Sequence, residues 1–395
     1  MAKAPTAKRP RTATDSCEYE QLSTGWVHTP LQRGRSSDGR RRDFYICADG
    51  DFEDAIFNLH DILRPEFWLE LAQGTSVTCC ASSTWERRSR PCSPSDWEGL
   101  GEQRARLREE GYSRLANATE PLEANALARA VATLVRYGWH PLWCVVFDEA
   151  WLWLARIAPI LSSLVHPEAT PNYDFMSWYI DAAKCKKGWT PHRDRCTMDF
   201  QPDGAPQYAT VWLSLTEATL LNGCIHILPA NFDRVYLSND LEKTQSHDEK
   251  QTNEWLQDIR ALPCEQAEAL VWTGRALHFG GRSCRRAPVP RIALACAVSV
   301  PAFEDPDMRC PNLWQQQPSH TEKQEPSRSR SGEGISAPVR RMRMPSLAER
   351  LNVIAVQLFH YDAPLGESSI QICAQERRLL QALDEFFSTG GDTAR

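Results

Sequence analysis

The sequence lacks the cysteine patterns that mark metal clips and redox motifs. Its 14 cysteines are scattered over 395 residues, and no two of them have the spacing C-x-x-C. Cys79 and Cys80 are adjacent, a spacing poorly suited to holding one metal ion. We therefore interpret the cysteines as mostly reduced, small, buried apolar residues, and we expect no disulfide framework.

Targeting and membrane signals are also missing. The segment MAKAPTAKRPRTATDS has no apolar core of the kind that a secretory signal needs. The most apolar stretch, residues 142–165, is interrupted by Asp148, Glu149 and Arg156, which argues against a membrane span. The final Thr-Ala-Arg is not a peroxisomal tripeptide. These features predict a cytoplasmic protein without a membrane partner, and the basic run KRPR at residues 8–11 leaves a nuclear location open.

The overall charge shows no excess of basic residues. A net charge of −6 gives no indication of a nucleic-acid partner. The composition, 42% hydrophobic and 24% charged, is that of an ordinary globular protein with enough apolar material for a core. No internal repeat is visible.

Composition divides the chain into five segments. Residues 1–43 are polar and basic and predict a disordered tail, whereas residues 44–106 form an extension whose role the sequence does not indicate. The main folded domain, which contains the candidate site described below, is expected over residues 107–305. Residues 306–345 predict a flexible linker, because residues 315–345 contain no Phe, Trp or Tyr. Residues 346–395 predict a C-terminal helical segment.

Within the core, helical patterns precede strand patterns. Residues 120–138 predict a helix with Thr119 as N-cap and Gly138 at its end, and residues 148–165 predict a second helix. From residue 172 onward the chain consists of short runs rich in β-branched and aromatic residues, separated by Gly, Pro, Asn or Asp. This order favours a mainly β fold with flanking helices, either a sandwich or a barrel.

The C-terminal segment has its own helix signals. Ser346 and Glu349 have the spacing of a capping box at the start of the pattern LAERLNVIAVQLF. Residues 370–387 predict a second, amphipathic helix. We expect these helices to pack on the core, although contact with a partner is the alternative.

One histidine-x-acid triplet stands out by its context. Ten histidines and 51 acidic residues in 395 positions would give about 1.3 such triplets by chance, so the motif alone is weak evidence. Five occur, but only His192 and Asp194 lie at the start of a strand region with a later histidine in matching context. In an extended strand these two side chains share a face, where an imidazole and a carboxylate can bind one metal ion.

Two further residues complete the candidate site. His278 follows an apolar strand and a glycine turn, so that His192, Asp194 and His278 would form a facial triad suited to Fe(II). Arg291 begins the run RIALACAVSV, in which alternate alanines share its face and leave room beside the guanidinium for a carboxylate. A core histidine and a solvent-exposed arginine are the structural alternatives.

Together these motifs resemble the phytanoyl-CoA dioxygenase family of Fe(II)/2-oxoglutarate oxygenases over about residues 107–300. The resemblance rests on LREEGYSRLAN, FDEAWLWLARIAPIL, HRD, TVWLSLTEATLLNGCIHILPAN and ALHFGG…PRIAL. The family's Pro-Gly-Ser-His segment is replaced here by Pro-Ala-Asn-Phe at residues 229–232. Asp194 is retained, which favours hydroxylation over halogenation.

The resemblance implies a double-stranded β-helix, the jelly-roll or cupin-like core. It implies His192, Asp194 and His278 as iron ligands, Arg291 as the partner of the 2-oxoglutarate distal carboxylate, and Trp212 and Asn222 near that co-substrate. The implied reaction consumes O₂ and 2-oxoglutarate, with ascorbate as a reductant, releases succinate and CO₂, and hydroxylates an unactivated C–H bond of a small-molecule or acyl substrate. The alternatives are a non-catalytic binding module of the same fold and a cupin metalloenzyme that does not use 2-oxoglutarate.

Overall fold

The computed structural model describes residues 18–22, 25–29, 59–78, 83–195, 200–237, 256–303, 313–316, 340–362 and 374–389. The chain divides into two compact units, Met1–Asp43 and Phe44–Arg395. In the first unit, strands β1 (Glu18–Leu22) and β2 (Gly25–Thr29) pair antiparallel. The predicted disorder of residues 1–43 concerns mostly residues outside the described ranges and stays a prediction.

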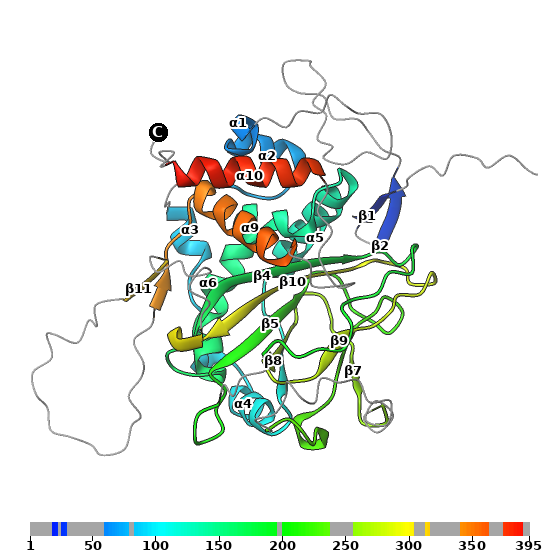
Figure 1. Cartoon of the computed structure of the whole chain (residues 1–395), viewed down its shortest axis with the longest axis vertical. Coiled ribbons are helices and arrows are strands. Elements are labelled where there is room, and N and C mark those ends of the chain that lie inside the picture. The colour runs from blue at the N-terminus through cyan, green and yellow to red at the C-terminus, as the bar shows by residue number, and fades with distance from the viewer. Residues whose placement is uncertain are drawn as a thin grey trace, which may run out of the picture. The chain divides into compact units, whose positions relative to one another are not determined.

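A five-stranded antiparallel sheet forms the centre of the second unit (Figure 1). Its strand order is β3-β8-β5-β10-β4. The strands span Tyr112–Leu115 (β3), Ala269–Thr273 (β8), Tyr208–Ser214 (β5), Arg291–Ser299 (β10) and Thr170–Ile180 (β4). The β-branched and aromatic runs of the sequence therefore form the strands that were expected from them.

A smaller antiparallel sheet has the order β7-β6-β9. It consists of β7 (Arg260–Leu262), β6 (Ile225–Ile227) and β9 (His278–Gly280). Isolated antiparallel bridges join Lys187 to Arg282 and His192 to His278. The segment 187–192 therefore lies beside β9 in the position of a fourth strand of this sheet. Along the chain, β4, segment 187–192, β5, β6, β7, β8, β9 and β10 are shared between the two sheets in the alternating order of a double-stranded β-helix. The expected jelly-roll core is confirmed.

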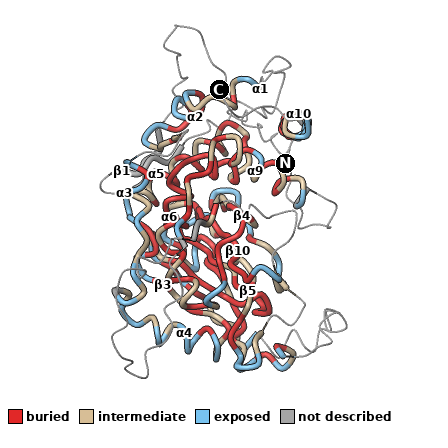
Figure 2. Tube along the Cα trace, turned by 90° about the vertical axis from the view of Figure 1, so that its left-hand side faces the viewer, coloured by how far each residue is buried: buried red, intermediate tan, exposed pale blue. Residues whose placement is uncertain are grey.

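Helices cover one side of the large sheet. α5 (Pro121–Arg136), η2 (Pro141–Val146) and α6 (Asp148–Leu164) pack near β4 and β10. Figure 2 shows buried residues running through these helices and strands, which together form the hydrophobic core. The predicted N-cap of α5 is wrong: Glu120 occupies that position because Pro121 begins the helix, and Thr119 instead accepts a hydrogen bond from Arg156 at 3.4 Å.

The C-terminal segment packs on this helical layer. α9 (Leu347–Asp362) contacts β4 and η2, and α10 (Ala374–Ser388) contacts α9. The capping box is present, because Ser346 Oγ accepts from the Glu349 backbone N–H at 3.3 Å while Glu349 accepts from the Ser346 N–H at 2.8 Å. Arg350, fully buried, binds Asp148 of α6 at 2.7 Å. This ion pair fastens α9 to the core.

Two short strands lie within the segment predicted as a linker. β11 (Trp314–Gln316) and β12 (Arg340–Met342) pair antiparallel, so the two ends of the intervening stretch lie side by side. The residues between them lie outside the described ranges, and their flexibility stays a prediction.

The extension before residue 107 consists of short helices. They are α1 (Leu59–Ile62), α2 (Pro65–Leu71), α3 (Ser83–Arg88), η1 (Pro94–Asp96) and α4 (Leu100–Glu109). Two more 3-10 turns, η3 (Ala230–Phe232) and η4 (Pro301–Phe303), lie in the core. Within the part of the chain that the structure describes, no helix has the length and apolar character needed to cross a bilayer.

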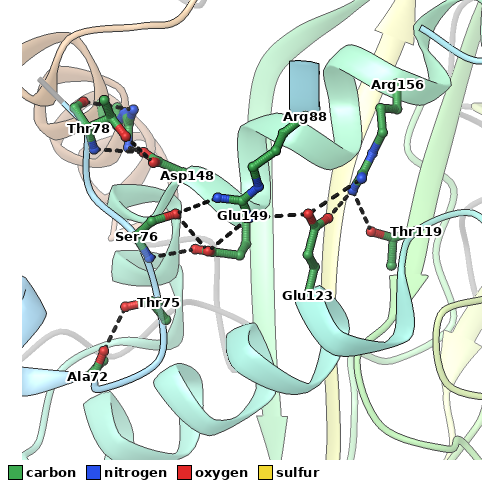
Figure 3. A network of polar contacts seen from close by, with 11 residues as sticks. Ala72, Thr75, Ser76, Thr78, Arg88, Thr119, Glu123, Asp148, Glu149 and Arg156 are labelled. Carbon is green, nitrogen blue, oxygen red and sulfur yellow. Dashed lines mark hydrogen bonds and ion pairs between the residues drawn. The ribbon is translucent and has the colours of Figure 1, made fainter. Parts of the chain in front are cut away.

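A polar network joins this extension to the helical layer (Figure 3). Arg88 of α3 lies between Glu149 of α6 and Glu123 of α5, at 3.5 and 3.2 Å. Ser76 donates to Glu149 at 2.8 Å, and Arg156 pairs with Glu123. Each of the two carboxylates therefore accepts from several donors, as buried charges require.

Candidate metal centre

Two histidines from distant parts of the chain form a backbone pair. The His192 N–H donates to the His278 carbonyl at 3.0 Å, and the His278 N–H donates to the His192 carbonyl at 3.0 Å. The sequence separates them by 86 positions, and the antiparallel register of segment 187–192 against β9 brings them together. Their ring centroids are 4.3 Å apart.

In both histidines, the ring nitrogen Nδ1 is hydrogen-bonded to a backbone carbonyl oxygen. His192 Nδ1 lies 2.7 Å from the Thr190 carbonyl oxygen, and His278 Nδ1 lies 3.0 Å from that of Ala276. A carbonyl oxygen can only accept, so Nδ1 carries the proton in each ring. The Nε2 lone pair is then available to a metal ion, the arrangement typical of metal-binding histidines.

Asp194 is the third member of the group, and its two carboxylate oxygens have different neighbours. Oδ2 accepts from Thr210 Oγ1 at 2.6 Å and from Trp272 Nε1 at 2.8 Å. Oδ1 faces the two imidazoles, 3.5 Å from His192 Nε2 and 3.7 Å from His278 Nε2. One ligand atom from each of the three residues lies within 4.8 Å of the others. Cis ligands about 2.1 Å from one ion would be about 3 Å apart, so small side-chain movements would suffice to bind it.

Burial and charge set the protonation of the group. Burial lowers the pKa of His278 to about 4, which keeps this imidazole neutral. Burial alone would raise the pKa of Asp194, but the electrostatic effect of His278 and His192 and the hydrogen bonds of His192 and Thr210 outweigh it and lower that pKa. For His192, burial is likewise outweighed, and the hydrogen bond and charge of Asp194 raise its pKa. An ionised carboxylate beside a neutral imidazole is the state that a divalent cation binds.

The three side chains line a cavity of about 400 Å³ on the inner face of the large sheet. Alternate residues of each strand face it, as the twofold period of a strand requires. β4 contributes Asp174, Met176 and Trp178; β5 contributes Tyr208, Thr210 and Trp212; β10 contributes Arg291, Ala295 and Ala297. Cys296 of β10 also lines the cavity, whereas Ala293, the alanine next to Arg291 on its face, does not.

Arg291 is a buried guanidinium without a carboxylate partner among the described residues. It is 1% exposed, and its Nη1 donates to the Gly223 carbonyl at 2.5 Å. Its Nε has no hydrogen-bond partner within the described structure. Burial lowers its pKa to about 10, so the side chain is still charged at neutral pH. A buried, charged donor with unused hydrogen-bonding capacity provides a site for an anion.

Two glycines allow the backbone to approach this guanidinium closely. A Cβ at Gly188 would lie 2.6 Å from Gly280 Cα and 3.1 Å from Arg291 Nη2. A Cβ at Gly280 would lie 2.7 Å from Gly188 Cα and 3.2 Å from Arg291 Nη1. Any larger residue would therefore push apart the two segments that carry His192 and His278, and would crowd the anion site.

The other two predicted co-substrate residues differ in their positions. Trp212 lines the cavity, with its ring centroid 5.8 Å from the Arg291 guanidinium carbon. Asn222 is fully buried outside the cavity lining and holds a turn, accepting from the Thr219 N–H and donating to the Glu217 carbonyl, each at 2.7 Å. This turn leads into Gly223, whose carbonyl binds Arg291, so Asn222 acts on the anion site only indirectly.

Several cavity residues were not singled out in the sequence. Thr210 and Trp272, which hold Asp194, could have been found from alternation, because Thr210 lies two residues before Trp212 on the same strand face. Trp178 and Trp189 also line the cavity, whereas Tyr179 does not, since it lies on the opposite face of β4 from Trp178. His360 also lines the cavity from α9, and no local pattern connects that helix to this site.

The comparisons with known proteins agree with this geometry at the level of the family. The model of the family described as phytanoyl-CoA dioxygenase (PhyH) matches residues 102–287. No curated protein matches the chain.

Three solved structures are similar to the chain at low sequence identity. The α-ketoglutarate-dependent epimerase SnoN from nogalamycin biosynthesis is 14% identical at a TM-score of 0.39, over 52% of this chain and 82% of SnoN. EctD from S. alaskensis with bound Fe is 15% identical at 0.41, over 55% of this chain and 86% of EctD. AviO1 from Streptomyces viridochromogenes Tue57 is 16% identical at 0.40, over 52% of this chain and 97% of AviO1. Values this low support no conclusion about activity.

The donor set and the cavity fit the cofactors of that family. Two imidazole Nε2 atoms and one carboxylate oxygen are a ligand set suited to Fe(II). Arg291, whose Nε has no hydrogen-bond partner among the described residues, is suited to a dicarboxylate co-substrate such as 2-oxoglutarate. Residues 102–287, which contain His192, Asp194 and His278, are similar to the phytanoyl-CoA dioxygenase family, and the chain is an enzyme of the Fe(II)/2-oxoglutarate-dependent oxygenase class.

Proposed function

We propose that the chain hydroxylates an unactivated C–H bond of a small-molecule or acyl substrate, with release of succinate and CO₂. In this proposal His192, Asp194 and His278 hold the ferrous ion, and Arg291 holds the distal carboxylate of 2-oxoglutarate. The observation that carries the proposal is the combination of these two features in one cavity: three converging ligand atoms and an unpaired, buried guanidinium.

The residues around the triad fix its geometry before any ligand binds. Thr210 and Trp272 hold Asp194 Oδ2, so that Oδ1 is directed between the two imidazoles. The Nδ1 bonds to backbone carbonyls fix the tautomer and orientation of both rings. Such outer hydrogen bonds are worth about 10- to 100-fold in metal affinity. When bound, the ferrous ion would supply the activation of O₂ that the side chains alone cannot.

The co-substrate end of the cavity is built around Arg291. A carboxylate there would accept a bidentate pair of charge-assisted hydrogen bonds and would satisfy the unpaired Nε. Trp212 would form an apolar wall beside it. Asn222 is assigned a positioning role, because it holds the turn whose Gly223 carbonyl orients the guanidinium.

One assay tests the proposal without knowledge of the substrate. The purified full-length chain is incubated with Fe(II), ascorbate and labelled 2-oxoglutarate, and succinate is measured. We expect slow, uncoupled succinate formation that His192→Ala abolishes, whereas Asn352→Ala, an exposed change on α9, has no effect. Absence of succinate in the wild-type protein at saturating Fe(II) would contradict the proposal.

The alternatives predict different outcomes in the same experiment. A non-catalytic binding module would contain no stoichiometric metal and would form no succinate. A cupin metalloenzyme independent of 2-oxoglutarate would bind a metal but would leave 2-oxoglutarate unchanged. Arg291 disfavours this second alternative, because such an enzyme has no need for a buried anion site in the metal cavity.

A further inference from the structure

Three of the described arginines line the cavity, and they differ in their partners. Arg193 forms an ion pair with Asp233 at 2.5 Å. Arg195 and Arg291 line the cavity as well, and in the part of the chain that the structure describes neither has a carboxylate within ion-pair distance. The function proposed above uses Arg291 for the co-substrate. Arg195 is left without an assigned role.

Arg195 is held in a defined position. Its main-chain N–H donates to the Gly274 carbonyl at 2.8 Å. Its guanidinium carbon lies 4.5 Å from the Tyr208 ring centroid, and its Nη2 donates to the Phe303 carbonyl at 2.8 Å. Stacking on the ring and this hydrogen bond restrict the side chain before any ligand arrives, so less conformational entropy is lost on binding.

A glycine makes room for this side chain. A Cβ at Gly274, the residue after β8, would lie 2.8 Å from Cβ and Cγ of Arg195 and 2.9 Å from Tyr208 Cδ1. Arg195 therefore passes between the Gly274 main chain and the Tyr208 ring, a course that a larger residue at position 274 would block. Such a residue would displace the guanidinium without removing its charge.

The guanidinium of Arg195 has hydrogen-bonding capacity to spare. Of its five N–H donors, one donates to the Phe303 carbonyl, and the others have no acceptor among the described residues. Tyr208 does not act as a counter-ion, because burial raises its pKa well above the usual value and keeps the phenol neutral. A charged guanidinium with unused donors on a cavity wall is complementary to an anion.

Strand register places Arg195 and Arg291 at opposite ends of the cavity wall. Arg291 is the first residue of β10, whereas Tyr208, on which Arg195 stacks, pairs with Ser299, the last residue of β10. Thr210, which donates to the carboxylate of the triad, lies two residues from Tyr208, about 7 Å along β5. The triad therefore lies between the two guanidinium groups and nearer to that of Arg195.

The described acidic residues of the lining have partners within the protein. Asp174 accepts a hydrogen bond from Gln357 Nε2 of α9 at 2.8 Å. Asp194 accepts one from Thr210 Oγ1 at 2.6 Å and belongs to the triad. An anion that enters this end of the cavity therefore finds, in Arg195, a charge with unused donors.

We propose that the substrate is a small carboxylic acid whose carboxylate binds to Arg195, so that a C–H bond a few bonds away from it lies beside the triad. The proposal rests on the function proposed above, in that this cavity is the reaction chamber. One atom of O₂ would enter the acid as a hydroxyl group and the other would enter succinate as CO₂ leaves. The cavity of about 400 Å³ must also hold the co-substrate, which suits a small acid and leaves little room for a large thioester.

The probes are small aliphatic and aromatic acids such as butyrate, hexanoate and benzoate, each compared with its primary amide and with a phosphate monoester of the same carbon skeleton. Binding to the metal-free, full-length chain is measured by ligand-detected NMR, and succinate formation is measured with Fe(II) and 2-oxoglutarate. We expect at least one acid to bind about tenfold or more tightly than its amide and its phosphate monoester. The same acid should raise succinate formation above the uncoupled rate.

Variants assign the carboxylate to one arginine. Arg195→Gln should remove the preference for the acid over the amide, and Arg195→Lys, which keeps a charge, should restore part of it. Arg291→Met should retain the preference, because the probe does not occupy the co-substrate site. Gly274→Ala should weaken binding of the acid but not of the amide, since it displaces the guanidinium. Arg108→Gln, a change of an exposed arginine on α4, is the matched control and should have no effect.

Three results would overturn the inference. One is that no acid binds in preference to its amide while the wild-type protein still forms uncoupled succinate, which would leave the oxygenase function intact. The second is a preference that persists in Arg195→Gln or disappears in Arg291→Met. The third is a phosphate monoester that binds more tightly than the matching acid. Absence of uncoupled succinate would instead count against the oxygenase function, and the NMR measurement would still decide on the role of Arg195.

Discussion

Replacement of Arg291 by methionine should affect stability and co-substrate binding in opposite directions. Burial lowers the pKa of this guanidinium from 12.5 to about 10, which corresponds to a cost of about 3 kcal/mol for holding the charge in the empty cavity. Methionine removes that cost but also the hydrogen bond to the Gly223 carbonyl, worth about 1 kcal/mol. We expect the free energy of unfolding without 2-oxoglutarate to rise by about 1–2 kcal/mol.

The same change should strongly lower the affinity for 2-oxoglutarate. A carboxylate that enters the cavity of Arg291→Met would be buried without its partner, at a cost of about 3–5 kcal/mol. At about 1.36 kcal/mol per tenfold, this raises the 2-oxoglutarate requirement by about two hundred- to several-thousand-fold.

Chemical denaturation of the metal-free protein and succinate formation as a function of 2-oxoglutarate concentration measure the two effects. Arg350→Met is the matched control, because Arg350 is also fully buried but is paired with Asp148. Its loss should destabilise the protein by about 3–5 kcal/mol. If Arg291→Met were destabilised to the same extent and kept its 2-oxoglutarate requirement, Arg291 would be a structural residue and the reasoning would be refuted.

Three other changes have defined outcomes. Gly188→Ala should lower both stability and 2-oxoglutarate affinity, measured by denaturation and by succinate formation, because the new Cβ would lie 2.6 Å from Gly280 Cα; unchanged values would contradict the close approach. Thr210→Val should weaken Fe(II) binding about 10- to 100-fold in a metal titration, since it removes a hydrogen bond to Asp194, and wild-type affinity would count against that role. Burial would raise the pKa of Asp148, but its arginine partner outweighs burial and lowers it. The stability lost in Asp148→Asn should therefore be largest above about pH 4 and disappear as the pH falls through the native pKa; a difference independent of pH between 2 and 6 would contradict this.

Local patterns predicted the elements of the core because each depends on neighbouring residues. The helix at α6 and the strands at β4, β5, β8 and β10 follow from periodicity and composition, and the Ser346–Glu349 capping box follows from spacing. The N-cap of α5 was wrongly predicted as Thr119, because a proline at the first helical position decided the boundary. The helices of the extension were missed, since short helices held by long-range contacts such as Arg88 with Glu123 carry little local signal.

The candidate site was predictable to the extent that it follows from strand alternation. His192, Asp194, His278 and Arg291 were proposed from spacing, and the structure places all four side chains along one cavity. The contribution of α9 was not predictable, because Gln357 reaches β4 only through packing of a segment more than 180 positions away.

The ferrous site is tested most directly by anaerobic spectroscopy of the full-length chain. Fe(II) and then 2-oxoglutarate are added, and the visible charge-transfer absorption of an iron-bound 2-oxo acid is recorded. We predict that the band appears only when both are present, at one equivalent of Fe(II) per chain, and that it is lost in His192→Ala and in His278→Ala. A wild-type protein that binds Fe(II) but develops no band with 2-oxoglutarate, or a band that persists in both variants, would contradict the assignment of these residues.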